Sequence, residues 1–116
     1  MISRIWHGWT KREHADEYEN MLRTDMLPGI HRVPGYQGAY LLRRDDGDEV
    51  AFVTITQFDD MDAVRRFAGE DFTRAVIYPP ARRILTRFDE HSMHYETILT
   101  PDDVRRLASE HSHDGR

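Results

Sequence analysis

YQGAYLLRRDDGDEVAFVTITQF, residues 36–58, contains two apolar segments on either side of a polar DDGD. Asp46-Gly47 is typical of a tight hairpin turn, because glycine accepts the positive φ angles that such turns need. The pattern therefore predicts two paired antiparallel strands. The second strand is apolar at nearly every position up to Ile55, which indicates that both of its faces are covered.

Two further strands are predicted outside this hairpin. ISRIWHGW, residues 2–9, is rich in β-branched and aromatic residues and is too short for a helix. Strand alternation puts Arg4 and Trp6 on one face of it and His7 on the other. HSMHYETI, residues 91–98, predicts the last strand.

Two capped helices are predicted between the strands. TKRE at residues 10–13 matches a capping box, so a helix should begin there and end at the PG of residues 28–29. Asp59 and Asp60 are candidate caps of a second helix over residues 61–69, which ends in glycine.

Shorter helical segments are predicted near the C-terminus. Two of them cover residues 71–76 and 81–88. Thr100-Pro101 opens another, with a cap and a first-turn proline in the preferred places. Few apolar residues follow, so we expect this helix to be weakly docked and residues 111–116 to be disordered.

The order of elements predicts an α+β fold of the ferredoxin-like type, β-α-β-β-α-β, with a four-stranded antiparallel sheet and both helices on one face. Residues 1–99 should form this domain, and residues 100–116 a charged C-terminal tail. The sheet face away from the helices would expose Val53 and Ile55 to solvent. The simplest resolution is a homodimer that forms through this sheet face.

The composition excludes several classes of protein. The chain has 116 residues and a net charge of −5 with no clustered basic face, which argues against nucleic-acid binding. It has no cysteine, so disulfides, thiolate zinc sites and iron–sulfur clusters are excluded, and nucleotide-binding motifs are missing. No stretch approaches the ~18 consecutive apolar residues of a membrane span. The N-terminus also lacks the apolar run of a signal peptide, so we expect no membrane association and a cytoplasmic location.

Three features together resemble the antibiotic biosynthesis monooxygenase superfamily. They are PGYxG at residues 34–38 entering a strand, the DDGD hairpin at residues 45–48, and a strand that ends in the aromatic Phe58 before a capped helix. The resemblance covers residues 1–98. It implies a small dimeric α/β barrel, in a family that includes cofactor-free oxygenases of phenolic polycyclic substrates and haem-degrading enzymes.

The resemblance also indicates which branch of the family to expect. In the oxygenases the third strand ends Asn-x-x-x-Trp, and both side chains line the substrate pocket; the matching positions here are Thr54 and Phe58. The haem-degrading set of Asn, Trp and His has no full counterpart, because Phe67 matches the tryptophan and residues 75–80 read AVIYPP where the axial histidine is expected. We therefore expect no cofactor.

Two histidines are candidates for catalysis. If the first and last strands pair Ile2 with Leu99, His7 lies opposite His94. Two imidazoles at that distance could share a proton or supply a general base near neutral pH. The alternative is that each histidine is hydrogen-bonded at the dimer interface. A metal site is not predicted, because the two histidines of residues 91–94 point to opposite faces of a strand.

Aromatic residues form an unusual share of the apolar side chains, and aromatic walls suit a flat, electron-rich ligand. The resemblance places the pocket beside the second helix. The predicted substrate pocket consists of Trp6, Tyr40, Thr54, Phe58 and Phe67, with Tyr78 or a histidine as the proton donor to a peroxide. For each aromatic residue, simple core packing is the alternative.

The leading hypothesis is a homodimeric, cofactor-independent monooxygenase that acts on a small aromatic or polyketide-like molecule. A second hypothesis is a non-catalytic binding or stress-related dimer, which the replacements at Thr54 and Phe58 favour. A third is a polyketide cyclase or isomerase on the same scaffold, which needs the same pocket but no oxygen.

Overall fold

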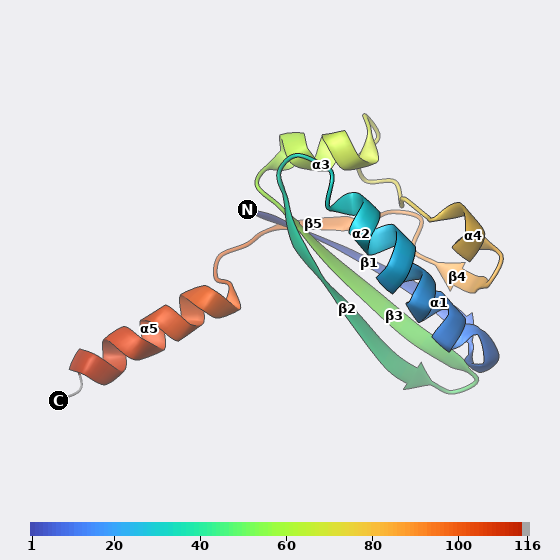
Figure 1. Cartoon of the computed structure of the whole chain (residues 1–116), viewed down its shortest axis with the longest axis horizontal. Helices are drawn as coiled ribbons and strands as arrows, with labels where there is room; N and C mark the ends of the chain where they lie inside the picture. The colour runs from blue at the N-terminus through green and yellow to red at the C-terminus, as the bar shows by residue number, and fades with distance from the viewer. Residues whose placement is uncertain (115–116) are drawn as a thin grey trace.

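A computed structural model describes the backbone of residues 1–114 and the side chains of residues 1–110. The described chain contains an antiparallel sheet with helices against one of its faces (Figure 1). Its strands are β1 (Ile2–Lys11), β2 (Tyr36–Asp46), β3 (Glu49–Phe58), β4 (Leu85–Phe88) and β5 (Met93–Glu96).

The strand order is β2, β3, β1, β4, and β5 also pairs with β1. Because β3 pairs with β1 over its full length, β4 and β5 follow one another along the opposite edge of β1. They occupy the place of the single last strand that the sequence predicted. The ferredoxin-like α+β architecture is confirmed.

The hairpin between β2 and β3 is also confirmed. Asp46 pairs with Glu49, and the turn residue Gly47 has a φ of 65°. Only the glycine has positive φ, so the turn is Gly47-Asp48 rather than Asp46-Gly47. Burial alternates strictly along β3, with even-numbered residues buried and odd-numbered residues half-buried.

The first helical layer starts later than predicted. It consists of η1 (Arg12–His14), α1 (Ala15–Met21), the π-helical η2 (Leu22–Met26) and α2 (Leu27–Ile30). Thr10 does not cap it: this residue is fully buried in β1, opposite Val50, because pairing with β3 continues to Lys11. The layer continues through Pro28 to Ile30, beyond the predicted end.

The second helix, α3 (Met61–Ala68), follows the prediction. Oδ1 of Asp60 accepts a hydrogen bond from the backbone N–H of Ala63 at 2.9 Å. Gly69, with a φ of 88°, ends the helix. A single cap and a single glycine thus define this element, as the sequence indicated.

Residues 70–92 differ from the prediction. Residues 71–76 form a loop in which Arg74 bridges to His91, and the helix after it is the single turn α4 (Pro79–Arg82). Residues 85–88 are a strand, because the free edge of β1 around Gly8 offers backbone hydrogen bonds that a helix would leave unmade.

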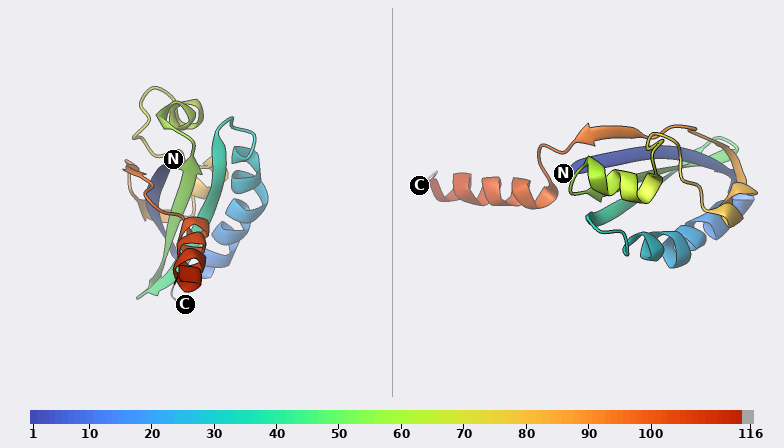
Figure 2. Two further views of the ribbon diagram at one scale, coloured as in Figure 1. Left: turned by 90° about the vertical axis from the view of Figure 1, so that its left-hand side faces the viewer. Right: turned by 90° about the horizontal axis from the view of Figure 1, so that it is seen from above.

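The last helix, α5 (Pro101–Asp114), extends away from the rest of the molecule (Figures 1 and 2). Its predicted start is confirmed: Thr100 Oγ1 accepts from the N–H of Asp103, and Asp103 Oδ2 accepts from the N–H of Thr100. Its apolar side chains Val104 and Leu107 are exposed. The helix continues through residues 111–114, where the sequence predicted disorder, and residues 115–116 lie outside the described chain.

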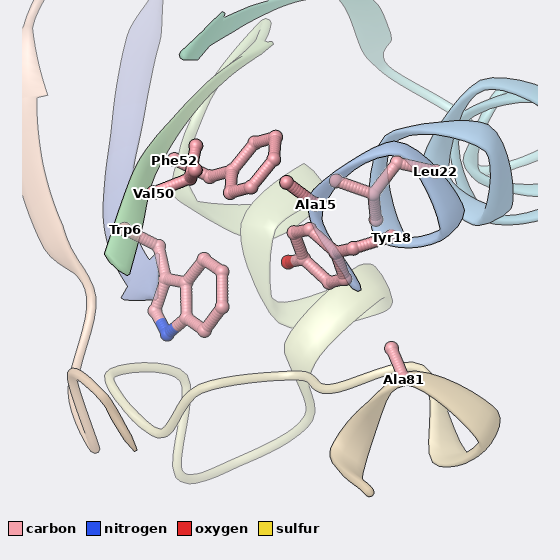
Figure 3. Packing of buried hydrophobic residues seen from close by; sticks show 7 residues of the cluster. All are labelled: Trp6, Ala15, Tyr18, Leu22, Val50, Phe52 and Ala81. Carbon is pink, nitrogen blue, oxygen red and sulfur yellow. The ribbon is translucent and has the colours of Figure 1, made fainter. Parts of the chain in front are cut away.

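The core has two parts on the inner face of the sheet. The larger packs β1 and β3 against the first helix, and its buried residues are Trp6, Ala15, Tyr18, Leu22, Val50, Phe52 and Ala81 (Figure 3). The smaller packs the end of β3 against α2 and α3 around the fully buried Phe58. Among the described helices, none is long and apolar enough to cross a bilayer.

Candidate functional site

A cavity lies between the inner face of the sheet and the helices. Its walls come from β1, β3, α1, η2, α3 and the segment that leads into α4. Its aromatic lining residues are Trp6, Tyr18, Phe67 and Tyr78. Its volume is about 30 Å³, which holds roughly two water molecules. A flat aromatic ligand therefore enters only if half-buried wall residues such as Met26 and Phe67 move.

Arg4 contributes a buried cation to this cavity. Alternation along β1 turns its side chain inward, and it is 4% exposed. Nη1 donates to the carbonyl oxygen of Phe72 and to Nε2 of His94 at 3.1 Å, and Nη2 donates to the carbonyl oxygen of Arg74 at 2.8 Å. Burial lowers the pKa of Arg4 to about 10, so the side chain stays cationic at neutral pH.

His94, a residue of β5, is a side-chain hydrogen-bond partner of the Arg4 guanidinium. Because a guanidinium only donates, Nε2 of His94 accepts this hydrogen bond, and the neutral ring carries its proton on Nδ1. Burial and then the charge of Arg4 lower the pKa of His94. The ring of Phe72 packs edge-on against it at 5.5 Å. His94 is therefore a neutral partner that orients Arg4.

Tyr78 contributes a hydroxyl group to the lining of the cavity. It donates a hydrogen bond to Oδ2 of Asp25 at 3.2 Å. Partial burial and the Asp25 carboxylate raise the pKa of Tyr78. Asp25 belongs to the π-helical η2 and is exposed. The pair therefore links the cavity wall to solvent through a hydrogen bond, and π-helical turns are frequent at functional sites.

Tyr18 supplies a second hydroxyl group. Its side chain is buried, and its oxygen points toward the space beside Trp6 (Figure 3). Burial raises the pKa of Tyr18, so this group is a neutral donor. The indole Nε1 of Trp6 already donates to the carbonyl oxygen of Asp89 at 2.8 Å. The cavity thus combines aromatic walls with a few polar groups, the usual composition of a small-molecule site.

The predicted site residues are partly brought together. Four of them line the cavity: Trp6, Thr54, Phe67 and Tyr78. Phe58 lies on the same face of the sheet but is fully buried in the smaller core, where it packs against Tyr36 and Phe67. Phe58 therefore packs against the lining residue Phe67 but does not line the cavity itself.

Tyr40 lies on the other face of the sheet. It pairs with Ile55, whose side chain points away from the helices, and is therefore exposed. The bulge between Tyr36 and Gly38 helps to set this register. The structure thus separates Tyr40 from the cavity to which the sequence assigned it.

The predicted pairing of His7 with His94 is wrong. β5 pairs with β1 so that Arg4 lies opposite His94, an offset of three residues from the predicted register. An odd offset puts the two histidines on opposite faces of the sheet. His7 lies on the open face, where its Nδ1 is 2.8 Å from Oδ2 of Asp89.

Sequence reasoning missed Arg4, Tyr18 and Asp25 as parts of the site. The signal for Arg4 was its position two residues before Trp6, on the same face of a strand. Tyr18 belongs to the apolar residues with helical spacing in residues 15–26, which are Ala15, Tyr18, Met21, Leu22 and Met26. The signal for Asp25 was that it alone interrupts this apolar spacing, although its contact with Tyr78 joins two distant segments.

Fold and cavity define a ferredoxin-like α+β protein with a small, aromatic-walled cavity between its sheet and its helices. The family model for antibiotic biosynthesis monooxygenase matches residues 1–77, and the chain belongs to this family. The resemblance seen in the sequence is thereby confirmed.

Solved structures support the fold. MhuD, a haem degrader from Mycobacterium tuberculosis, is 18% identical with a TM-score of 0.60 and covers 86% of this chain and 98% of its own. SnoaB, a cofactor-independent oxygenase from Streptomyces nogalater, is 23% identical with a TM-score of 0.59, covering 86% and 96%. An antibiotic biosynthesis monooxygenase is 23% identical with a TM-score of 0.60, covering 85% and 100%. No curated protein sequence matches the chain.

The MhuD structure holds two haems, but the residues of this cavity do not fit one. Within the described chain no histidine lines the cavity, and Nε2 of His94 is engaged by Arg4. Among described residues, no cluster of three or more His, Asp or Glu side chains could hold a metal ion.

Proposed function

We propose that this protein is a homodimeric, cofactor-independent monooxygenase of a small aromatic or polyketide-like molecule. The observation that carries the proposal is the cavity between sheet and helices, where the aromatic rings of Trp6 and Phe67 meet the hydroxyl of Tyr78. Family membership supports the same class of reaction. The proposed location, the cytoplasm, rests on the sequence alone.

In the proposed reaction the substrate supplies its own electrons. A proton leaves a carbon acid, the carbanion reduces O₂ while a carbon–oxygen bond forms, and the resulting peroxide takes up a proton and loses water to leave a carbonyl group. The chain positions the substrate, excludes water and moves protons. Tyr78 is the proposed proton-transfer group, because its hydroxyl lies on the cavity wall and donates a hydrogen bond to the Asp25 carboxylate, which is the proposed acceptor of the substrate proton.

The geometry changes the proposed roles of the two histidines. His94 is proposed as a positioning residue for Arg4, since its Nε2 is already occupied. His7 is proposed to lie at the dimer interface with Asp89, on the face away from the cavity. Neither is proposed to remove a substrate proton.

Oxygen uptake with an anthrone or a quinol tests the proposal. The native protein should consume O₂, and Tyr78→Phe should slow turnover by about 100-fold, the lower range for loss of a general acid–base group. Tyr40→Phe is the matched control, because Tyr40 lies on the other face of the sheet. Absence of uptake across the substrate panel, or full activity of Tyr78→Phe, would contradict the proposal.

A binding protein without catalysis is the second candidate. It is supported by Thr54, which stands where the oxygenases have an amide side chain, and by the small volume of the cavity. A ligand that raises the melting temperature without oxygen uptake would favour this candidate or a cyclase. Product analysis of the ligand after incubation separates those two.

We further propose that residues 1–99 form the functional domain and dimerise through the open face of the sheet. Apolar side chains on that face are exposed, with Leu42 at 48% and Met93 at 60%. Residues 100–116 are proposed to be a tail that the fold does not require. A chain that ends at Leu99 should then melt cooperatively at nearly the native temperature.

A further inference from the structure

Arg4 carries the cationic side chain of the cavity wall, and its charge is not balanced. It is 4% exposed, and none of the ion pairs in the described part of the chain includes it. Its three hydrogen-bond partners are two backbone carbonyl groups and neutral His94. Buried charges are ordinarily paired with opposite charges, so this one is an exception that calls for an explanation.

Two N–H groups of the Arg4 guanidinium donate no hydrogen bond within the described chain. Nη1 uses both of its hydrogens, on Phe72 and His94, and Nη2 uses one, on Arg74. Nε and the other hydrogen of Nη2 have no acceptor among the described residues. In the described chain, every side-chain nitrogen that is inaccessible to solvent has a hydrogen-bond partner. Because Nε of Arg4 has no such partner, it must be accessible to water. The cavity, which Arg4 lines, is a space that water can enter.

The surroundings of Arg4 suit an aromatic ligand with an acidic group. The guanidinium carbon lies 5.5 Å from the centre of the Phe67 ring, and both side chains line the cavity with Trp6. Nε and Nη2 are adjacent nitrogens that match the two oxygens of a carboxylate or the single oxygen of a phenolate. A ring between the aromatic walls would place such an oxygen at the guanidinium.

We propose that Arg4 is an anion-binding residue and that the ligand of this cavity is an aromatic molecule with an anionic oxygen, a carboxylate or a phenolate. The inference rests on the proposed function only in that the cavity is the ligand site. Phe72 and Arg74 orient the guanidinium through their carbonyl groups, and His94 orients it from β5.

Matched pairs of probes test this assignment by calorimetry, without turnover. The native protein should bind 2-naphthoate about tenfold more tightly than 2-naphthamide, and should bind 4-nitrophenol more tightly than 4-nitroanisole with the bound phenol ionised at lower pH. A preference in the first pair alone identifies a carboxylate ligand, and one in the second pair alone identifies a phenolate. Equal affinities within both pairs, or no binding of any probe, would overturn the proposal.

Variants locate the preference at Arg4. Arg4→Met keeps the aliphatic part of the side chain and should abolish the preference for the anionic probes. Arg4→Lys keeps the positive charge but loses the two adjacent N–H donors of the guanidinium, and should reduce this preference. Arg65→Met is the control, since Arg65 is exposed, lies over the ring of Phe72 at 5.3 Å and does not line the cavity. A folded Arg4→Met protein that still prefers the anions would overturn the assignment. If Arg4→Met does not fold, the native probe pairs and Arg4→Lys decide.

The outcome is separable from that of the proposed function. Anion preference without oxygen uptake would refute the monooxygenase and leave the assignment of Arg4 intact. Oxygen uptake by a protein that binds the amide and the carboxylate equally would refute the assignment of Arg4 alone.

Discussion

At the scale of single residues, the shape of the cavity depends on a glycine. A Cβ atom at Gly8 would lie 2.5 Å from Cη2 of Trp6, closer than two carbon atoms can approach. Trp6 cannot easily give way, because its Nε1 is bonded to Asp89 and its ring lies in the core. Gly8 therefore lets the indole lie flat along β1 and form one wall of the cavity.

Gly8→Ala should accordingly destabilise the protein by about 1–3 kcal/mol, the range for overpacking in a core. Thermal unfolding measures the loss, and Trp fluorescence should report a moved indole. Gly29→Ala is the control, because a Cβ atom there meets nothing within 4 Å. Equal melting temperatures for the two variants would contradict this account of Trp6.

His94 should make stability depend on pH. Its pKa is lowered in the folded state by burial and by the charge of Arg4, so the unfolded chain binds a proton more readily. The stability contributed by neutral His94 is complete above its unfolded pKa of about 6.5 and is lost as pH falls through that value toward the lower folded pKa.

His94→Gln tests this dependence, because the amide oxygen of glutamine can still accept from Arg4. The melting temperature of the native protein should fall from about pH 8 to pH 5.5, and that of the variant should fall less. His31→Gln, at an exposed position, should follow the native curve. Parallel curves for native and His94→Gln proteins would show that His94 does not titrate with a lowered pKa.

At the scale of elements, α3 carries Phe67 to the cavity and depends on its cap. Asp60→Ala removes the acceptor for the N–H of Ala63 and should cost about 1 kcal/mol. Asp62→Ala is the matched control, because Asp62 only pairs with exposed Arg65 and should change stability by less than about 0.5 kcal/mol. Chemical denaturation compares the two, and a larger effect at Asp62 would contradict the assigned cap.

Elements with a local signal were predictable from the sequence. Gly47, Asp60 and Thr100 each specify a turn or cap through contacts within a few residues. Residues 85–88 were predicted as a helix because a short apolar run is ambiguous between helix and strand. The backbone hydrogen bonds of β1, far away in the sequence, decide in favour of the strand.

The candidate site was predictable only in part, for the same reason. Alternation along β1 and β3 correctly placed Trp6 and Thr54 on the inner face. The partner of His94 depended on the register of β5, which no nearby residue determines. An offset of three residues replaced a predicted histidine pair by the contact between His94 and Arg4.

At the scale of the whole molecule, the helices cover one face of the sheet and leave the other open (Figure 2). Ile5, Val53 and Ile55 lie at the centre of the open face and are half-buried, while Tyr40 and Leu42 beside them are exposed. Monomeric proteins seldom expose a contiguous apolar surface of this kind. A second copy of the chain would cover it with a surface of the same character.

Ile55→Glu should therefore convert the proposed dimer to a monomer, because a carboxylate at the centre of an apolar interface loses its hydration without gaining a partner. Sedimentation at several concentrations measures the change, and circular dichroism shows whether the fold is kept. Asn20→Glu adds the same charge on the exposed side of α1 and should leave the dimer intact. A native protein that sediments as a monomer at high concentration would refute the dimer, whereas a dimeric Ile55→Glu protein would move the interface to another surface.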